Sequence, residues 1–208
     1  MLIDPPVLGA FALAAAAIVL SPGPDTMLIL RAALGAGRRA GFAAVAGVQI
    51  GLAVHTALAA AGVSAVIASS PLLFRILAIV GAAYLAWLGF QGFRGGGRLT
   101  LGSGAPAGAG RACRDALLCN LLNPKVVVLF LALYPNFLDV ARGGLAAQVA
   151  MLSAVLLLIN VGWQSLLVIG ADCARNSLTR PEVQRTIGRL TGAILLLFAA
   201  AMLWEHAA

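Results

Sequence analysis

Two short motifs in this chain of 208 residues place prolines and a charge inside an apolar stretch. Residues 21–25 read Ser-Pro-Gly-Pro-Asp, and residues 120–125 read Asn-Leu-Leu-Asn-Pro-Lys. The carboxylate of Asp25 could accept hydrogen bonds from an ammonium group, and the amine of Lys125 could donate them to a carboxylate. An acid and an amine that lie close together therefore suit a zwitterionic ligand, which would compete with their own pairing.

The prolines of both motifs predict broken helices. Proline inside a helix removes a backbone hydrogen bond and clashes with the carbonyl four residues before it. Two prolines around Gly23 predict local unwinding of a helix through residues 7–34, and Pro124 predicts at least a kink in a helix through residues 116–134. The N-terminus of each second half-helix then lies at a break, where free amides and a partial positive charge suit an anion.

Each charge also has a plain structural interpretation. Asp25 could cap its half-helix, and Lys125 could extend its amine towards the membrane surface. Lys125 lies near the centre of its apolar stretch, where an ionised side chain costs at least about 2.5–3.5 kcal/mol. The functional interpretation is therefore favoured more for Lys125 than for Asp25, which lies nearer to one end of its stretch.

The composition indicates that lipid surrounds the elements that carry these motifs. The chain is 62% hydrophobic and 10% charged, with a mean hydropathy of +1.00, whereas soluble domains contain about 25% charged residues. The sequence shows no nucleophile–base cluster, metal-ligand set or phosphate loop, and the length leaves no room for a soluble catalytic domain. No catalytic residue, cofactor or metal is predicted, and we expect that the chain is not an enzyme. Six apolar stretches are predicted as membrane-spanning helices: residues 7–34, 41–68, 72–93, 116–134, 145–171 and 187–204.

The basic residues predict the orientation of these six helices. Most of the 14 Lys and Arg residues lie in the first, third and fifth connections, whereas the second and fourth connections contain only Arg75 and Arg142. The positive-inside rule places the basic connections in the cytosol and both termini on the periplasmic side of a bacterial inner membrane. A net charge of +7 that is distributed in this way sets topology, so nucleic acid is not predicted as a partner.

The predicted architecture is an all-α, polytopic membrane protein that forms one transmembrane domain over residues 1–208. Residues 1–93 form a first repeat of three helices, residues 94–114 a cytosolic linker, and residues 115–208 a second repeat. Because three is odd, the second repeat crosses the membrane in the opposite sense. Secondary transporters often use such inverted repeats, with the substrate site at the repeat interface near mid-membrane.

Polar residues in other spans add weaker candidates. Gln49 lies in the second span, and Asn160 and Gln164, four residues apart, share a face of the fifth. They could line a path for a solute, or they could form hydrogen bonds between helices. The spacing of Gly47 and Gly51 indicates close helix packing. The predicted substrate-binding residues are Pro22, Gly23, Pro24, Asp25, Gln49, Asn123, Pro124, Lys125, Asn160 and Gln164.

These motifs resemble the LysE/RhtB family of bacterial amino-acid exporters. The similar segments occur in the family's order along essentially the whole chain: residues 21–25, 37–42, 47–51, 81–89, 120–125, 134–137 and 189–193. The resemblance implies export of an amino acid or a derivative, and a homodimer. Protonation of Asp25 could couple this export to inward proton flow.

Two other function classes stay open at this point. An exporter or pore for another small solute or ion could use the same six-helix plan, although a site with both an acid and an amine favours a zwitterion over a bare cation. A membrane-embedded enzyme would need an acid–base or metal cluster that the sequence does not show.

Overall fold

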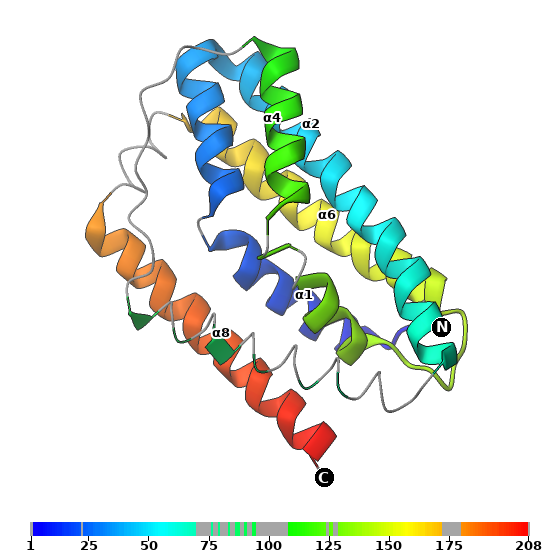
Figure 1. The fold of residues 1–208 in the computed structure, drawn as a ribbon. Coiled ribbons are helices and arrows are strands. Elements are labelled where there is room, and N and C mark those ends of the chain that lie inside the picture. Colours follow the sequence, from blue (N-terminus) through cyan, green and yellow to red (C-terminus); the bar gives the residue numbers. More distant parts are fainter. Residues whose placement is uncertain are drawn as a thin grey trace.

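The computed structural model describes residues 2–21, 23–69, 108–123, 125–126, 129–171 and 180–207, together with single positions between residues 76 and 94. These described residues form helices and no strand (Figure 1). The elements are α1 (Pro5–Leu20), α2 (Pro24–Ser69), α4 (Ala109–Leu121), the π-helical turn η1 (Leu129–Leu133), the 3-10 turn η2 (Tyr134–Phe137), α6 (Leu145–Ile169) and α8 (Pro181–Ala207).

The first apolar stretch is broken in two, as its prolines predict. α1 ends at Leu20 and α2 begins at Pro24. α1 has 16 residues, fewer than the roughly 20 that cross a bilayer. Proline is favoured at the first position of a helix because its missing N–H would have no partner there. Pro24 therefore lies where a second half-helix starts.

α2 reverses direction at Gly37. The backbone angles there are φ 80° and ψ 174°, a region that glycine alone adopts without strain. The two arms of α2 meet at this reversal, the first in darker and the second in lighter blue (Figure 1). The first two predicted spans therefore form a helical hairpin with a sharp turn.

The fourth predicted span is broken in a similar way. α4 ends at Leu121 after 13 residues, and the backbone of Asn123 is not helical. Lys125 and Val126 are helical again, and η1 and η2 are described from Leu129 onwards. The fourth span therefore contains a break between two helical parts and not merely a kink.

The helices pack around α2 and α6. α2 lies against α4 and α6, and α1 lies against α6 and α8. The approach of α4 to α2 depends on two glycines, because a Cβ on Gly47 would collide with the carbonyl oxygen of Cys113 and a Cβ on Gly51 would lie 2.5 Å from Oδ1 of Asn120. The prediction of close packing at this glycine pair is confirmed.

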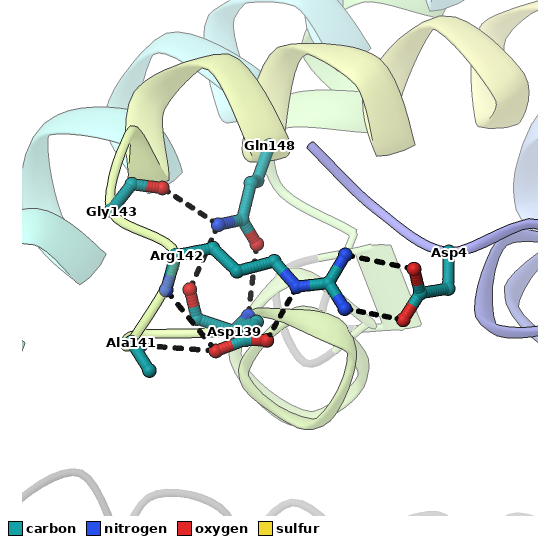
Figure 2. A network of polar contacts seen from close by, with 6 residues as sticks. All are labelled: Asp4, Asp139, Ala141, Arg142, Gly143 and Gln148. Atoms are coloured by element: carbon teal, nitrogen blue, oxygen red, sulfur yellow. Dashed lines mark hydrogen bonds and ion pairs between the residues drawn. The ribbon is translucent and has the colours of Figure 1, made fainter. Parts of the chain in front are cut away.

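At one end of the bundle, a polar network connects the start of α1 with the segment before α6 (Figure 2). The guanidinium of Arg142 donates two hydrogen bonds to the carboxylate of Asp4, at 2.8 and 2.6 Å, and its Nε lies 2.9 Å from Oδ2 of Asp139. The buried amide of Gln148 donates to the carbonyls of Asp139 and Gly143 and accepts from the backbone N–H of Asp139. The network fixes the connection between η2 and α6 and attaches it to the start of α1.

At the opposite end of the bundle, a hydrogen bond connects α2 with α6. Arg38, directly after the reversal at Gly37, donates a hydrogen bond to the carbonyl of Ile169 at the end of α6, at 3.1 Å. The first connection and the end of α6 therefore lie at one end of the bundle, and the start of α1 lies with residues 139–144 at the other (Figure 1). This arrangement agrees with the alternation of basic residues along the sequence.

The outer surface is apolar. Two helical stretches, Pro24–Gly62 and Leu145–Ile169, are long and apolar enough to cross a membrane, and Pro5–Leu20 is a shorter apolar helix. Soluble proteins rarely expose large contiguous apolar patches, which mark contact with a membrane or a partner. Large side chains that are more than half exposed include Leu13, Leu58, Leu122, Leu158, Leu197 and Trp204.

Some boundaries differ from those that hydropathy predicts. α4 begins at Ala109, so the last residues of the predicted linker 94–114 are helical. α8 begins at Pro181, before the predicted start at residue 187. In the third predicted span, residues 72–93, the structure describes only scattered positions, and these are helical. Hydropathy misses these helix starts because they contain arginine and lie beyond the apolar stretch.

Candidate functional site

The two helix breaks meet inside the bundle. The amine of Lys125, after the second break, donates a hydrogen bond of 2.8 Å to the backbone carbonyl of Ser21 at the first break. Ser21 is the C-cap of α1, and carbonyls at the end of a helix have no intrahelical partner. Gly23 lies beside this contact, and a Cβ there would lie at an ordinary van der Waals distance, 3.8 Å, from the Lys125 amine.

The carboxylate of Asp25 lies in the first turn of α2. Its Oδ2 accepts a hydrogen bond of 2.9 Å from the side-chain amide of Asn120, near the end of α4. Asp25 and Lys125 line one cavity. The sequence left open whether they pair directly, and in the structure each has another hydrogen-bond partner, the amide of Asn120 for the acid and the carbonyl of Ser21 for the amine.

Asn123 has a local role at the second break. Its Oδ1 accepts a hydrogen bond from the backbone N–H of Lys125 at 3.0 Å, and its backbone carbonyl accepts one from Val126. This is the geometry of an N-cap, which satisfies free amides at the start of a helix. Asn123 therefore starts the half-helix that carries Lys125, and it also lines the cavity.

Three amide side chains connect α2 with α6 beside the cavity. Nε2 of Gln49 donates to Oδ1 of Asn160 at 2.9 Å and to Oε1 of Gln164 at 3.1 Å. Asn160 and Gln164 line the cavity, whereas Gln49 is not part of its lining. The prediction left a solute path and interhelical hydrogen bonding open for these residues, and the structure shows the hydrogen bonds.

The cavity has a volume of about 50 Å³, with a polar side formed by the two breaks and the amides. By volume it has room for only a few water molecules, so it would have to widen to hold an amino acid. Its apolar side is formed by Ile18, Val19, Leu52, Val126, Leu129 and Leu156.

A buried aromatic cluster lies between the cavity and the end of the bundle that holds Asp4. The ring of Phe11 meets those of Tyr134 and Phe137 edge-on, with centroids 5.5 and 5.3 Å apart. Phe130 stacks on Tyr134 at 4.5 Å, and the Tyr134 hydroxyl lies 2.8 Å from that of Ser153. Phe11 and Tyr134 are completely buried, so this cluster closes the bundle on that side.

The sequence predicted both helix breaks. It did not predict that Asn120 contacts Asp25. Pro22 and Pro124 fall outside the described residues, whereas Pro24 starts α2. Asn120 stood in the second motif but was not predicted as a site residue, although its side chain is 1% exposed and bonded to Asp25. Its position in the motif was the only signal, because no pattern shows which helix an asparagine will face.

Apolar helices whose breaks enclose a small charged cavity define a membrane transport protein, since irregular backbone is tolerated at that depth only inside protein or beside a cavity. The chain matches the LysE type translocator family over residues 16–206. It therefore belongs to that family, and the resemblance recognised in its motifs is confirmed.

Similar proteins carry names that agree with this assignment. The chain is 32% identical over 199 residues to a leucine efflux protein of Enterobacter sp. (strain 638), covering 91% of each chain. It is 29% identical over 194 residues to a homoserine/homoserine lactone efflux protein of Salmonella typhimurium, covering 93% of this chain and 94% of the relative. No solved structure matches the chain. Membership of a family of translocators implies transport and not catalysis.

Proposed function

We propose that this protein is a secondary exporter of amino acids or amino-acid derivatives, which binds the zwitterionic part of its substrate between Asp25 and Lys125. One observation carries the proposal: the two broken helices meet at a cavity lined by one acid and one amine. The names of the efflux relatives support the substrate class.

The cavity suggests how such a substrate would be oriented. The substrate carboxylate would replace the carbonyl of Ser21 as a partner of the Lys125 amine, close to the free amides at the start of α2. The ammonium group would lie against Asp25. A short aliphatic side chain would then face the apolar side of the cavity, where it gains free energy from leaving water. Asp25 and Lys125 match the ammonium and the carboxylate of an amino acid whose side chain is neutral. A substrate with a cationic side chain would find no counter-ion for that side chain.

In this form the cavity is too small for an amino acid, and export requires that it widen. The cavity of about 50 Å³ is far smaller than the roughly 300 Å³ or more of common ligand pockets. Substrate release towards the end with Asp4 would require that Phe11 separate from Tyr134 and Phe137. We infer an alternating-access cycle in which this aromatic cluster is one gate.

The finer parts of the proposal concern coupling and topology. Protonation of Asp25 would weaken its hold on an ammonium, so exchange of a proton for substrate would drive export. The proposal includes six crossings in two inverted three-helix repeats, both termini on the periplasmic side of the inner membrane, and a homodimer. The opposite ends occupied by Asp4 with Arg142 and by Arg38 with Ile169 support this topology.

An exporter of a metal cation on the same plan is less well supported. Within the described part of the chain, no group of three or more His, Cys, Asp or Glu residues could hold a metal ion. An ammonium on Lys125 in the same cavity would also repel a cation.

A growth-rescue and efflux experiment tests the proposal. Bacteria that express the protein are challenged with excess leucine, threonine or homoserine, and the release of labelled amino acid from preloaded cells is followed. We expect rescue and faster release of at least one of them, and an efflux rate at least about tenfold lower for Lys125→Ala, which loses a hydrogen bond of a charged group. Leu122→Ala, which changes a side chain that is 79% exposed, is the control and should behave as the wild type. Equal efflux by the Lys125→Ala variant would contradict the proposal.

A further inference from the structure

We infer that Asn120 and Asp25 together form a subsite for a primary ammonium group, in which the side-chain carbonyl of Asn120 and the carboxylate of Asp25 each accept one of its hydrogens. This inference rests on the proposed function and extends it, because neither the sequence motifs nor the similar proteins assign a role to Asn120. The subsite makes Asn120 a residue that determines specificity for a free amine.

The first observation is a pair of unpartnered acceptors on two residues that are already bonded to each other. Asn120 donates from Nδ2 to Oδ2 of Asp25 at 2.9 Å. The remaining oxygens of the two groups, Oδ1 of Asp25 and Oδ1 of Asn120, are both buried and have no hydrogen-bond partner. Buried polar atoms are nearly always hydrogen-bonded in native proteins, so two such acceptors side by side indicate a place for a donor.

The second observation is the kind of donor that fits. A carboxylate oxygen and an amide oxygen accept hydrogen bonds and donate none. A primary ammonium has three N–H donors on one small positive atom, so a single group can reach both oxygens while its charge faces Asp25. A trimethylated nitrogen has the same charge but no N–H, and it would leave both acceptors without a partner.

The third observation is that the backbone of α2 holds the Asn120 amide in place. A Cβ on Gly51 would lie 2.5 Å from Oδ1 of Asn120, so that oxygen rests directly on the glycine. The backbone carbonyl of Asn120 accepts from Asn123 N–H and lies 3.4 Å from Nε2 of His55. Gly51 therefore helps to set the position of the amide, and a larger residue there would displace its oxygen.

The subsite lies where a substrate would reach it. Asp25 and Asn120 both line the cavity at the breaks, with Lys125 on the same cavity for the carboxylate. Their unpartnered oxygens are buried in this structure, so the ammonium would reach them as the cavity widens.

Two substitutions test the inference on purified full-length protein. Asn120→Leu removes both the carbonyl acceptor and the N–H donors of the side-chain amide at similar volume. Gly51→Ala keeps the amide but displaces its oxygen. Gly62→Ala is the matched control, because a Cβ on this glycine of the same helix meets nothing within 4 Å. Binding is measured by calorimetry for L-leucine, L-homoserine and the N-trimethylated form of each, and export is measured in proteoliposomes.

We expect that the wild type and Gly62→Ala bind the free amine more tightly than its trimethylated form. Asn120→Leu should weaken binding of the free amine roughly 10- to 100-fold, as expected for one or two hydrogen bonds to a charged group, and should weaken binding of the trimethylated form much less. Gly51→Ala should change binding in the same direction. Equal weakening of both forms would show a merely structural role for Asn120, and unchanged discrimination would also overturn the inference. If the wild type binds none of the four compounds, the proposed function itself fails.

Discussion

At the scale of single residues, the site is defined by which partner each charge finds. Lys125 and Asp25 each directly follow a proline in two separate motifs, yet the amine bonds to a backbone carbonyl and the acid bonds to an amide. A substrate carboxylate could replace the carbonyl of Ser21 at the Lys125 amine, and a substrate ammonium could bind the free oxygens of Asp25 and Asn120. In the structure, neither charged group has the other as its hydrogen-bond partner. Both groups therefore remain available to a substrate.

The cap at the second break gives a prediction at this scale. Asn123→Ala removes the acceptor for the backbone N–H of Lys125, and loss of an N-cap costs about 0.5–2 kcal/mol. We expect that loss in the free energy of unfolding, measured by denaturant titration in detergent. Asn123→Ser keeps a capping oxygen and should recover most of the loss. If serine is no better than alanine, the cap is not what Asn123 contributes.

The sequence could predict which residues approach the site but not how they pair. Proline chemistry is local, so residues 21–25 predicted the first break correctly. The contact between Asn120 and Asp25 joins residues 95 positions apart, and it depends on how closely α4 packs on Gly51. The sequence therefore left open whether Asp25 and Lys125 pair directly, because the motifs do not encode that packing distance.

At the scale of elements, one break and one reversal of the chain shape the first half of the bundle. The break separates α1 from α2, and the reversal is the turn within α2 at Gly37. The sequence predicted a connection near residue 37 from its arginines. The angles at Gly37 show why the connection needs no longer loop, since one glycine in an unusual conformation turns the chain.

Replacement of Gly37 by alanine gives a prediction for this element. A Cβ there meets no atom within 4 Å, so the cost comes from the backbone angles alone and should be about 1–3 kcal/mol. The free energy of unfolding in detergent measures it. Gly9→Ala in α1 also meets nothing within 4 Å, but its backbone is helical, and we expect a neutral or slightly stabilising effect there. Similar losses for both variants would contradict this account of the turn.

At the scale of the whole molecule, the helix breaks and the closed ends form one arrangement. The breaks meet at the cavity, the aromatic cluster lies on one side of it, and the network of Asp4, Arg142 and Gln148 connects the start of α1 with the segment before α6 (Figure 2). Hydropathy could predict that the chain is helical and lies in a membrane, because both follow from composition. It could not predict this network, because exposed charges near the ends of helices carry no periodic signal.

The pH dependence of stability tests the ion pair between Asp4 and Arg142 in this network. The hydrogen bonds from Arg142 hold the pKa of the Asp4 carboxyl below its ordinary value of 3.8. A lowered pKa means that the pair stabilises the fold above pH 3.8 and that this stabilisation is lost as the pH falls through the lowered value. We expect Asp4→Asn to lower the unfolding temperature at pH 5 to 7, with the difference from the wild type shrinking at lower pH. The effect should be small because the pair is exposed.

A control variant separates this link from a general effect of charge. Asp115 pairs with Arg114, the adjacent residue of the same helix, so Asp115→Asn breaks no link between elements and should leave the unfolding temperature nearly unchanged. A difference between Asp4→Asn and the wild type that stays constant down to pH 2.5 would show that the ion pair is not its source.

The central claim is that a substrate carboxylate binds the amine of Lys125, and the chain offers a direct measurement of it. Lys125 is the only lysine, so a small amine-reactive reagent modifies one side chain, and mass spectrometry can follow its rate with the terminal amine as an internal reference. The account predicts that an exported amino acid slows modification of Lys125 and leaves the terminal amine unaffected, whereas the matching amine without a carboxylate protects far less. If Lys125 reacts at the same rate with and without every exported amino acid, the account is wrong.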